Sequence, residues 1–287
     1  MSDRVRDIVI VGGGTAGWMA ACYLTAVLAT PNENERVAIT LIESKDIGII
    51  GVGEATLAHI KQIMIAIGID EGDFMRSCNA TFKNAIRFDN FRIKGETFWH
   101  PFTQLSHVNS YAMVNLWLAA RNAGYDGSYA EAVAQDPAMC LKFLAPKRPG
   151  DKPYDGLVNY AYHIDTIELG RYLRELGQQR GIRHVVDLVT DAGRDEGGNI
   201  THVATEEHGD IAGDLFIDCT GFRSLLLGKT LGEPFRSFND VLFNDSAVAM
   251  RVPHPDGLRD IRPYTTCSAQ DAGWIWNIPL YQRTGTG

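Results

Sequence analysis

The hydrophobic pattern near the N-terminus predicts a strand, a turn, a helix and a second strand. Residues 8–11 form a continuous apolar run, as expected of a central parallel strand. Helix-forming residues then extend from 15 to about 29, ahead of Pro31. A second apolar run, residues 37–42, leads directly into Glu43. This order predicts one βαβ unit and a Rossmann-like α/β fold.

The remaining pattern predicts further helices and strands around a less regular middle. We expect helices over about 57–67 and 167–181, a strand over 185–189, and two strands within 202–218 joined near Gly209 and Asp210. Aromatic residues, prolines and glycines concentrate between about 98 and 160. The chain is therefore interpreted as one module, 1–287. Its dinucleotide-binding core comprises about 1–97 and 160–287, and an inserted, substrate-facing region covers about 98–159.

Composition and charge narrow the class of protein. The 287 residues are 45% hydrophobic and 22% charged, an ordinary globular composition. A net charge of −8 and scattered Lys and Arg argue against a surface for nucleic acid or anionic membrane. The N-terminus lacks the order of regions found in a signal peptide. The glycines early in the apolar stretch 8–28 favour a strand and a helix over a membrane span, so we expect a cytoplasmic protein.

The five cysteines form neither a disulfide pattern nor a zinc pattern. Their number is odd, and no two are spaced as CxxC. We expect buried thiols in a reducing cytosol and no metal site.

The turn after the first strand carries a dinucleotide-binding pattern. Its residues are Gly12, Gly13, Gly14, Thr15, Ala16 and Gly17, with the spacing GxGxxG. The first glycine of this spacing permits a tight turn, the second lets the backbone approach a pyrophosphate, and the third allows close helix packing. The helix N-terminus faces the phosphate charge. The alternative is a turn that needs glycines and binds nothing, but the flanking strand and helix favour nucleotide binding.

Two further segments bear on the identity of the nucleotide. Glu43 is placed to accept hydrogen bonds from the hydroxyls of an adenosine ribose, and its charge disfavours the extra phosphate of NADP. Residues 214–218 form an apolar strand that runs into Thr220 and Gly221. This strand resembles the late strand of two-dinucleotide-fold flavoproteins, where the backbone comes close to the cofactor, so it favours FAD over NAD. An ordinary buried strand followed by a turn is the alternative.

Residues 273–279 read Gly-Trp-Ile-Trp-Asn-Ile-Pro. Two tryptophans one residue apart, closed by Ile-Pro, resemble the WxWxIP motif of flavin-dependent halogenases. Several segments together resemble the flavin-dependent tryptophan halogenases, in the order expected of that family: 12–21, 51–56, 78–83, 99–102, 163–165, 214–223 and 274–279. The resemblance therefore runs from end to end of the chain.

This resemblance implies a defined chemistry. A separate flavin reductase supplies FAD already reduced, and its reaction with O2 gives a flavin hydroperoxide. Halide, either chloride or bromide, attacks that peroxide and forms hypohalous acid. The acid moves through the protein to a separate site and halogenates an indole-type or tryptophan ring. The expected partners are the reductase and the small-molecule substrate, with a homodimer left open and neither nucleic acid nor membrane expected.

Lys83 matches the family's essential lysine. Its ammonium is suited to hydrogen-bond hypohalous acid, and its free amine to carry the halogen as a haloamine. The amine route needs a depressed pKa, which a desolvated pocket can produce. Taken alone, Lys83 would be interpreted as a surface lysine, but the match of the surrounding residues 79–86 favours the catalytic role.

The resemblance also assigns aromatic residues. Trp274, Trp276 and Pro279 would separate flavin from substrate; the alternative is a half-buried strand with alternating aromatics on one face. His100 and Phe102 match positions that sandwich the substrate's indole, where each stacked pair contributes about 1 kcal/mol beyond area burial. The alternative for His100 is a structural core histidine.

A few matches concern the cofactor or the scaffold. Gly53, Glu54 and Ala55 match the loop that touches the flavin, and Val189 falls where the family's backbone lines the adenine side. His163 and Asp165 are interpreted as structural.

The sequence departs from the family in length. In halogenases of this type the catalytic glutamate and the halide-binding Ser/Thr-Gly backbone follow well after the WxWxIP motif, so both are expected beyond residue 287. Residues 281–287 resemble the start of a hairpin. We expect a C-terminally truncated, N-terminal portion of a longer protein that is not catalytically competent alone.

Three functions stay open from the sequence. The first is an FAD-dependent aryl halogenase. The second is a single-component flavin-dependent aromatic hydroxylase, against which Lys83 and the two tryptophans argue. The third is a non-catalytic FAD-binding fragment or degenerate homologue.

Overall fold

The computed structural model describes residues 4–48, 51, 53–103 and 105–287. Val52, in the segment 51–56 that resembles the halogenases, lies outside the described residues. The chain divides into two compact units: unit 1 comprises 1–51, 66–69 and 166–245, and unit 2 comprises 52–65, 70–165 and 246–287. The interpretation of residues 98–159 as an insertion into one module stays a prediction.

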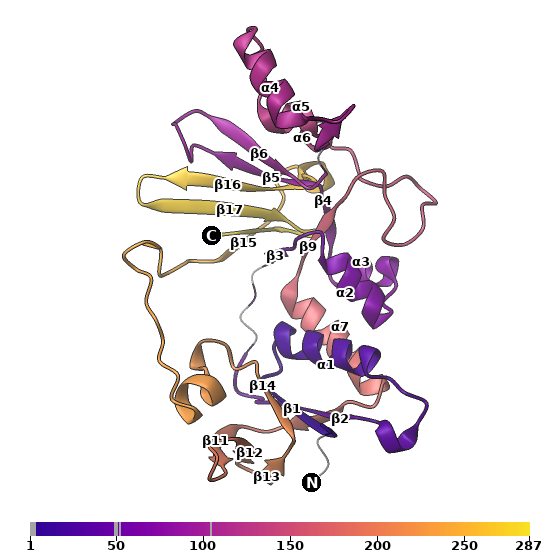
Figure 1. The fold of residues 1–287 in the computed structure, drawn as a ribbon, viewed down its shortest axis with the longest axis vertical. Helices are drawn as coiled ribbons and strands as arrows, with labels where there is room; N and C mark the ends of the chain where they lie inside the picture. The colour runs from indigo at the N-terminus through magenta and orange to yellow at the C-terminus, as the bar shows by residue number, and fades with distance from the viewer. Residues whose placement is uncertain (1–3, 49–50, 52, 104) are drawn as a thin grey trace. The chain divides into compact units, whose positions relative to one another are not determined.

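Unit 1 contains the predicted βαβ unit (Figure 1). Its parallel sheet has the strand order β10-β2-β1-β14. The elements of this layer are β1 (Asp7–Val11), α1 (Thr15–Val27), β2 (Ala38–Glu43), α7 (Thr166–Gln179), β10 (Arg183–Val186) and β14 (Leu215–Asp218). The predictions of the first strand, the first helix, the second strand and the later helix are confirmed to within a few residues.

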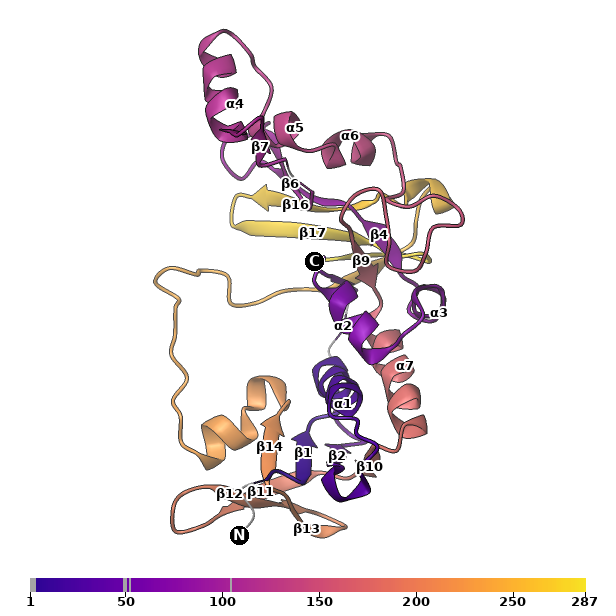
Figure 2. The same ribbon diagram turned by 45° about the vertical axis from the view of Figure 1, so that its right-hand side comes forward.

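A second sheet completes unit 1. It is antiparallel and consists of β11 (Val189–Arg194), β12 (Ile200–Thr205) and β13 (Gly209–Ala212). Figure 2 shows α1 and α7 on one side of the parallel sheet and β11–β13 on the other. Val9, Val11 and Ile42 of the parallel sheet form one buried cluster with Val203 and Ile211 of the antiparallel sheet. Alternate residues of β1 therefore face opposite layers, as expected of a strand buried on both faces.

Two strand predictions in unit 1 are wrong. The predicted strand 185–189 is divided between the end of β10 and the start of β11. The predicted pair of strands within 202–218 is three strands, β12, β13 and β14, and the turn lies at 206–208.

One buried carboxylate accounts for the break between β10 and β11 and for the position of the turn at 206–208. Asp187, 6% exposed, lies between β10 and β11. Its Oδ2 accepts hydrogen bonds from the backbone N–H of Glu207 (3.0 Å) and of His208 (2.9 Å), and from Nδ1 of His208 (2.7 Å). Because these bonds join residues about twenty positions apart, the local hydrophobic pattern does not reveal them.

Unit 2 is built on a six-stranded sheet of order β15-β18-β17-β16-β5-β6. The strands are β5 (Ala85–Asp89), β6 (Thr97–Pro101), β15 (Met250–Val252), β16 (Tyr264–Gln270), β17 (Gly273–Pro279) and β18 (Thr284–Thr286). β16 and β5 are parallel, and the other neighbours are antiparallel. Residues 281–287, predicted to start a hairpin, instead contain the turn and second strand of one that begins with β17, and Asn277 of β17 is opposite Thr286 of β18.

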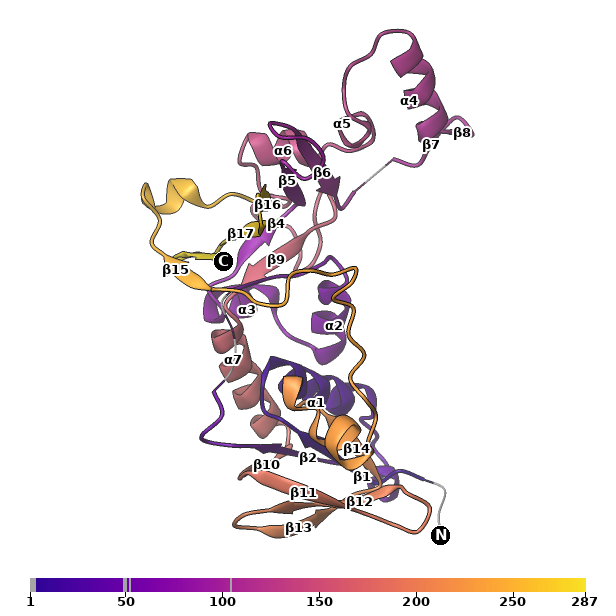
Figure 3. The same ribbon diagram turned by 90° about the vertical axis from the view of Figure 1, so that its left-hand side faces the viewer.

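Smaller elements surround this sheet. They are a three-stranded sheet of β3 (Glu54–Ala55), β9 (Ala161–Ile164) and β4 (Thr81–Lys83); a pair of strands, β7 (His107–Val108) and β8 (Tyr111–Ala112); and the helices α2 (Ile60–Ile67), α3 (Glu71–Ser77), α4 (Met113–Asn122), α5 (Tyr129–Val133) and α6 (Asp136–Leu141). The last residues of α2 belong to unit 1. Figure 3 shows α4, β7 and β8 standing away from the six-stranded sheet, with α5 and α6 closer to it.

Strand register assigns the aromatic residues of unit 2 to two faces. Trp276 is opposite Cys267, Cys267 is opposite Phe88, and Phe88 is opposite Phe98. These four residues therefore form a row on one face, and His100 shares that face because it is two residues from Phe98. We call this the aromatic face.

The opposite face of the sheet is packed. Trp99 and Tyr264 point to that side, where they form a buried cluster with Ala85 and with Cys140 of α6. The cysteines are free thiols; Cys22, Cys78, Cys140 and Cys267 are buried as predicted, whereas Cys219 is only partly buried. Among the described residues no helix combines the length and the apolar character that a membrane crossing requires.

Candidate active site

The glycine turn of unit 1 is shaped for close backbone approach. Gly12 has φ +113°, and a Cβ there would lie 2.2 Å from the carbonyl oxygen of Cys219, the residue after β14. A Cβ at Gly17 would lie 1.9 Å from the carbonyl oxygen of Gly12. At Gly14, by contrast, a Cβ would meet nothing within 4 Å. The turn is thus closed on the protein side and open at the glycine expected to face a pyrophosphate.

The N-terminus of α1 has no competing anion from its own sequence. Gly14 is the N-cap, no side chain caps the helix, and its first turn contains no acidic residue. The N–H groups of Thr15, Ala16 and Gly17 therefore lack partners within the helix. Together with the macrodipole, they form a site that fits a phosphate group.

Glu43 is held by side chains of unit 1. Its Oε2 accepts a hydrogen bond from Nε1 of Trp18 (3.0 Å), and its Oε1 accepts one from Nη1 of Arg174 (3.3 Å). A Cβ at Gly13 would lie 1.8 Å from Oε2, so glycine is required beneath the carboxylate. The side chain is 16% exposed, and a carboxylate has further lone pairs for a ribose hydroxyl. The site therefore fits an adenosine moiety.

Val189 is connected to the backbone of Glu43 through Asp187. It begins β11, two residues after Asp187, whose backbone N–H donates to the carbonyl oxygen of Glu43 at 2.9 Å. Unit 1 thus brings together the glycine turn, Glu43 and Val189.

Gly53, Glu54 and Ala55 belong to unit 2. Gly53 has φ +109°, and a Cβ there would lie 3.1 Å from Cδ1 of Leu280. Glu54 and Ala55 form β3 and pair with β9. Desolvation raises the pKa of the Glu54 carboxyl.

Lys83 is a buried amine at the end of β4. Its exposed fraction is 1%, which contradicts the interpretation of Lys83 as a surface lysine. Its Nζ donates a hydrogen bond to the carbonyl oxygen of Thr56 at 2.8 Å and lies 5.3 Å from the ring centroid of Phe102. Burial lowers the pKa of Lys83 to about 8, and the nearby Cys267 thiol opposes this only in part. The amine is therefore far easier to deprotonate than a surface lysine.

A buried polar network fixes the strands around Lys83. The hydroxyl of Thr81 donates to the carbonyl oxygen of Pro279 at 2.5 Å, so its oxygen accepts from Nδ1 of His163 at 3.0 Å. Nε2 of His163 then accepts from the hydroxyl of Thr265 at 3.0 Å. Desolvation and the neighbouring Lys83 hold the pKa of His163 well below its usual value. A neutral imidazole thus links β4, β9, β16 and the end of β17.

The two tryptophans of β17 lie on the aromatic face. Their ring centroids are 5.7 Å apart, with an interplanar angle of 58°. Trp274 is 42% exposed, whereas Nε1 of Trp276 is buried without a hydrogen-bond partner among the described residues.

His100 and Phe102 lie next to each other at the edge of unit 2. His100 is exposed on β6, which contradicts the interpretation of a core histidine, and its ring centroid is 6.2 Å from that of Phe102. A pocket of about 330 Å³ is lined by β6 and by residues 128–133. Asp136 is fully buried, and its Oδ1 accepts hydrogen bonds from the backbone N–H groups of Phe102 (3.2 Å) and Thr103 (3.1 Å).

Sequence reasoning did not single out Thr56, Asp136 or Arg174. Asp136 precedes a proline at the start of α6, which is a recognisable helix-start signal but says nothing of Phe102. The contacts of Thr56 and Arg174 join residues far apart in the sequence, and no local pattern reveals them. No group of His, Cys, Asp or Glu suited to a metal ion occurs among the described residues.

These two units define a class of protein. Unit 1 is a dinucleotide-binding α/β fold, and unit 2 contains a buried lysine close to Phe102. The family model described as tryptophan halogenase matches residues 7–287. The chain belongs to the tryptophan halogenase family.

Individual relatives are similar over nearly the whole chain. It is 42% identical to "Tryptophan 6-halogenase SttH" from Streptomyces toxytricini, over 100% of this chain and 58% of that protein. The structure of "Tar14, tryptophan C-6 flavin-dependent halogenase (chlorinase) from taromycin biosynthesis" matches with TM-score 0.88 and 45% identity, covering 98% of this chain and 56% of the other. A tryptophan halogenase from Shewanella frigidimarina matches with TM-score 0.92 and 38% identity, covering 99% and 55%. The chain thus spans a little over half the length of these relatives.

Proposed function

We propose that the protein carrying this chain is an FAD-dependent halogenase that acts on a tryptophan-type aromatic ring. Family membership supports this, as do relatives whose names specify tryptophan halogenation and flavin dependence. The observation that carries the proposal is Lys83, a fully buried amine 5.3 Å from the ring centroid of Phe102.

The glycine turn and Glu43 would hold the cofactor. The backbone from Gly12 through Gly13, Gly14, Thr15, Ala16 and Gly17 would bind the pyrophosphate, and Glu43 would bind the adenosine ribose. Val189 would line the adenine side, and Gly53, Glu54 and Ala55 would contact the flavin. Bound reduced FAD, with O2, supplies the oxidising equivalents that convert chloride or bromide to hypohalous acid.

Lys83 would connect hypohalous acid to the substrate. With a pKa of about 8, a large fraction of the amine is neutral under mildly basic conditions. A neutral amine that takes the halogen forms an N–halogen bond and releases water. The charged form would instead donate a hydrogen bond to the intact acid and polarise it. Both routes need an amine shielded from bulk water, which burial of Lys83 provides.

The aromatic residues would separate and shape the two sites. Trp274 and Trp276, with Pro279 anchored to Thr81, would keep the ring of the substrate away from the flavin. His100 and Phe102 would hold the substrate, since Phe102 is already within 5.3 Å of the amine. Bulk between the sites favours transfer of halogen over direct transfer of oxygen. The reductant would come from a separate flavin reductase.

Product analysis tests this function. The protein is incubated with FAD, a flavin reductase, NADH, bromide or chloride, and tryptophan or indole, and products are identified by mass. A halogenated ring is expected. Lys83→Ala should reduce it by at least about 100-fold, whereas Lys94→Ala, on the exposed turn between β5 and β6, should not change it. A hydroxylated ring as the main product would identify a flavin hydroxylase instead, and full halogenation by Lys83→Ala would remove Lys83 from the mechanism.

A further inference from the structure

The pairing of β3 with β9 is irregular at the residue that contacts Lys83. Glu54 is opposite Ile164 and Ala55 is opposite His163, so Thr56 is next in line to face Tyr162. The backbone N–H of Thr56 does donate to the carbonyl oxygen of Tyr162, at 2.9 Å. In a regular antiparallel ladder, such a pair also exchanges the reverse bond, from the N–H of Tyr162 to the carbonyl of Thr56.

That reverse bond is replaced by a side chain. The N–H of Tyr162 donates to Oγ1 of Thr56 at 3.0 Å, and the Thr56 hydroxyl also lies 3.0 Å from the carbonyl oxygen of Tyr162. Threonine hydroxyls can take over backbone hydrogen bonds in this way. The carbonyl of Thr56 is consequently left available, and it accepts the hydrogen bond from Nζ of Lys83 at 2.8 Å.

We propose that Thr56 is a positioning residue for Lys83: its hydroxyl occupies the place of its own carbonyl in the ladder, so that the carbonyl turns toward the lysine amine and fixes it. The inference rests on the proposed role of Lys83. It assigns a function to the side chain of Thr56, which follows directly after the predicted flavin-contacting residues Gly53, Glu54 and Ala55.

A carbonyl is suited to this task because it is neutral. A carboxylate beside Lys83 would strongly favour the ammonium form and raise its pKa. Among the residues that the structure describes, the thiol of Cys267 on β16 and the neutral imidazole of His163 on β9 are the ionisable groups that interact with the amine. The Thr56 carbonyl therefore holds the amine in place without fixing its positive charge. The hydrogen bond to Thr56 uses one N–H of the Lys83 ammonium, and its other N–H groups stay available to donate to hypohalous acid.

Two substitutions separate the hydroxyl from the shape of the side chain. Thr56→Val keeps the shape and removes the hydroxyl, so the carbonyl of residue 56 can return to the N–H of Tyr162. Thr56→Ser keeps the hydroxyl. Thr56→Ala also removes the hydroxyl and introduces no methyl group at the position of Oγ1, so it provides a second arm if the valine variant does not fold. Thr266→Val is the matched control. Thr266 is a buried threonine of β16 whose side chain points to the other side of the sheet from that of Cys267.

The pKa of Lys83 is the direct readout. It is measured from the ¹³Cε shift of labelled lysine as pH is varied, with the signal assigned by Lys83→Arg. Loss of an acceptor for the charged form should lower this pKa by about one unit in Thr56→Val and Thr56→Ala. Thr56→Ser and Thr266→Val should match the parent protein. An unchanged pKa in folded Thr56→Val or Thr56→Ala, or an equal fall in Thr56→Ser, would overturn the inference.

Product formation gives a second readout. In Thr56→Val we expect the halogenated product formed per FAD oxidised to fall about tenfold, with the substrate KM unchanged. A merely structural defect would lower FAD oxidation and halogenation together, which would count against a positioning role. If the parent protein itself gives no halogenated product, the proposed function fails, whereas the pKa comparison still decides the role of Thr56.

Discussion

Removal of the Glu71 side chain should destabilise unit 2 strongly. Glu71 is 4% exposed at the start of α3. Its Oε1 accepts hydrogen bonds from the hydroxyls of Tyr160 and Tyr162, both at 2.6 Å. Its Oε2 accepts from Nζ of Lys147 and from the backbone N–H of Tyr154 at 2.8 Å. One carboxylate therefore joins α3, β9 and the loop that contains Lys147 and Tyr154.

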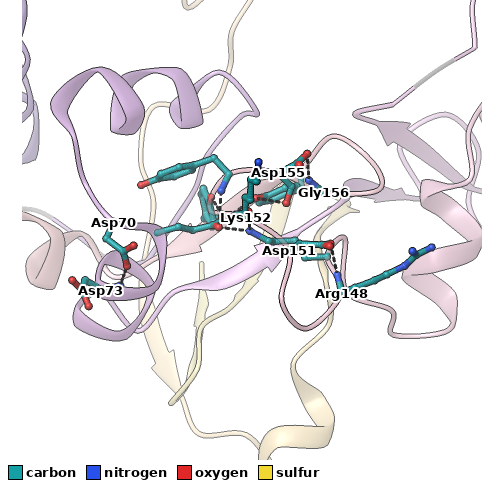
Figure 4. A network of polar contacts seen from close by, with 12 residues as sticks. Asp70, Asp73, Arg148, Asp151, Lys152, Asp155 and Gly156 are labelled. Atoms are coloured by element: carbon teal, nitrogen blue, oxygen red, sulfur yellow. Dashed lines mark hydrogen bonds and ion pairs between the residues drawn. The ribbon is translucent and has the colours of Figure 1, made fainter.

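The magnitude follows from what Glu71→Ala would leave behind. The side chain of Lys147 is 11% exposed, so its ammonium would stay largely buried, and among the described residues its remaining acceptor would be the carbonyl of Lys152. Breaking a buried ion pair by removing one partner costs about 3–5 kcal/mol. Figure 4 shows the loop that contains Lys152, with Asp70 and Asp73 on the neighbouring helix. Asp70→Ala removes only an exposed N-cap, whose hydrogen bond to the N–H of Asp73 is 2.9 Å, and should cost about 1 kcal/mol.

Urea unfolding followed by tryptophan fluorescence measures this difference. Trp99, Trp117, Trp274 and Trp276 lie in unit 2, so the signal reports mainly on that unit. With a slope of about 2 kcal/mol per molar urea, Glu71→Ala should lower the midpoint by about 1.5–2.5 M, and Asp70→Ala by about 0.5 M. Equal shifts for the two variants would refute the reasoning, because they would show that the buried pair contributes no more than a surface cap.

Two further predictions concern unit 1. Gly17→Ala places a Cβ 1.9 Å from the carbonyl oxygen of Gly12, so it should weaken FAD binding at least about tenfold. The affinity is measured by quenching of flavin fluorescence. An unchanged affinity would contradict the close packing of this turn. For Asp187, burial alone would raise the pKa, but the hydrogen bonds from His208 and Glu207 outweigh it and lower the pKa. The folded-state pKa therefore lies below the unfolded value, so this stabilisation is present above the unfolded pKa and lost as pH falls through the folded one. Acid unfolding followed by circular dichroism should begin at higher pH in Asp187→Ala than in Asp191→Ala, which replaces an exposed aspartate on β11, and coincident curves would exclude the effect.

The fold was predictable wherever local pattern determines it. The strand 8–11 and the helix after the glycine turn follow from apolar runs, glycines and turn residues. The break at Asp187 was not predictable, because it depends on hydrogen bonds to residues 207 and 208, far along the chain. Long-range polar contacts of buried groups leave no periodic trace in the sequence.

The residues of the candidate site likewise differ in how far local sequence predicts them. The glycine spacing was recognisable from the sequence, and the structure gives a steric reason for Gly12 and Gly17, where a Cβ would lie 2.2 Å and 1.9 Å from a backbone carbonyl oxygen. Lys83 carries no local sign of burial, and its role was expected only from the resemblance. The role proposed for Thr56 could not be predicted from the sequence. It depends on the N–H of Tyr162 bonding to Oγ1 of Thr56 and not to its carbonyl oxygen, which instead accepts from Lys83.

In the proposed mechanism, halide oxidation and ring halogenation are separate steps connected by Lys83. Its most direct test is the yield of trapped hypohalous acid in Lys83→Ala, measured with a soluble chlorination or bromination acceptor during turnover of reduced FAD. In Lys83→Ala we expect FAD oxidation to continue at the rate of the parent protein, trapped acid to rise, and halogenated tryptophan or indole to disappear. Loss of trapped acid together with loss of product would contradict this mechanism, because Lys83 would then be needed before the acid forms.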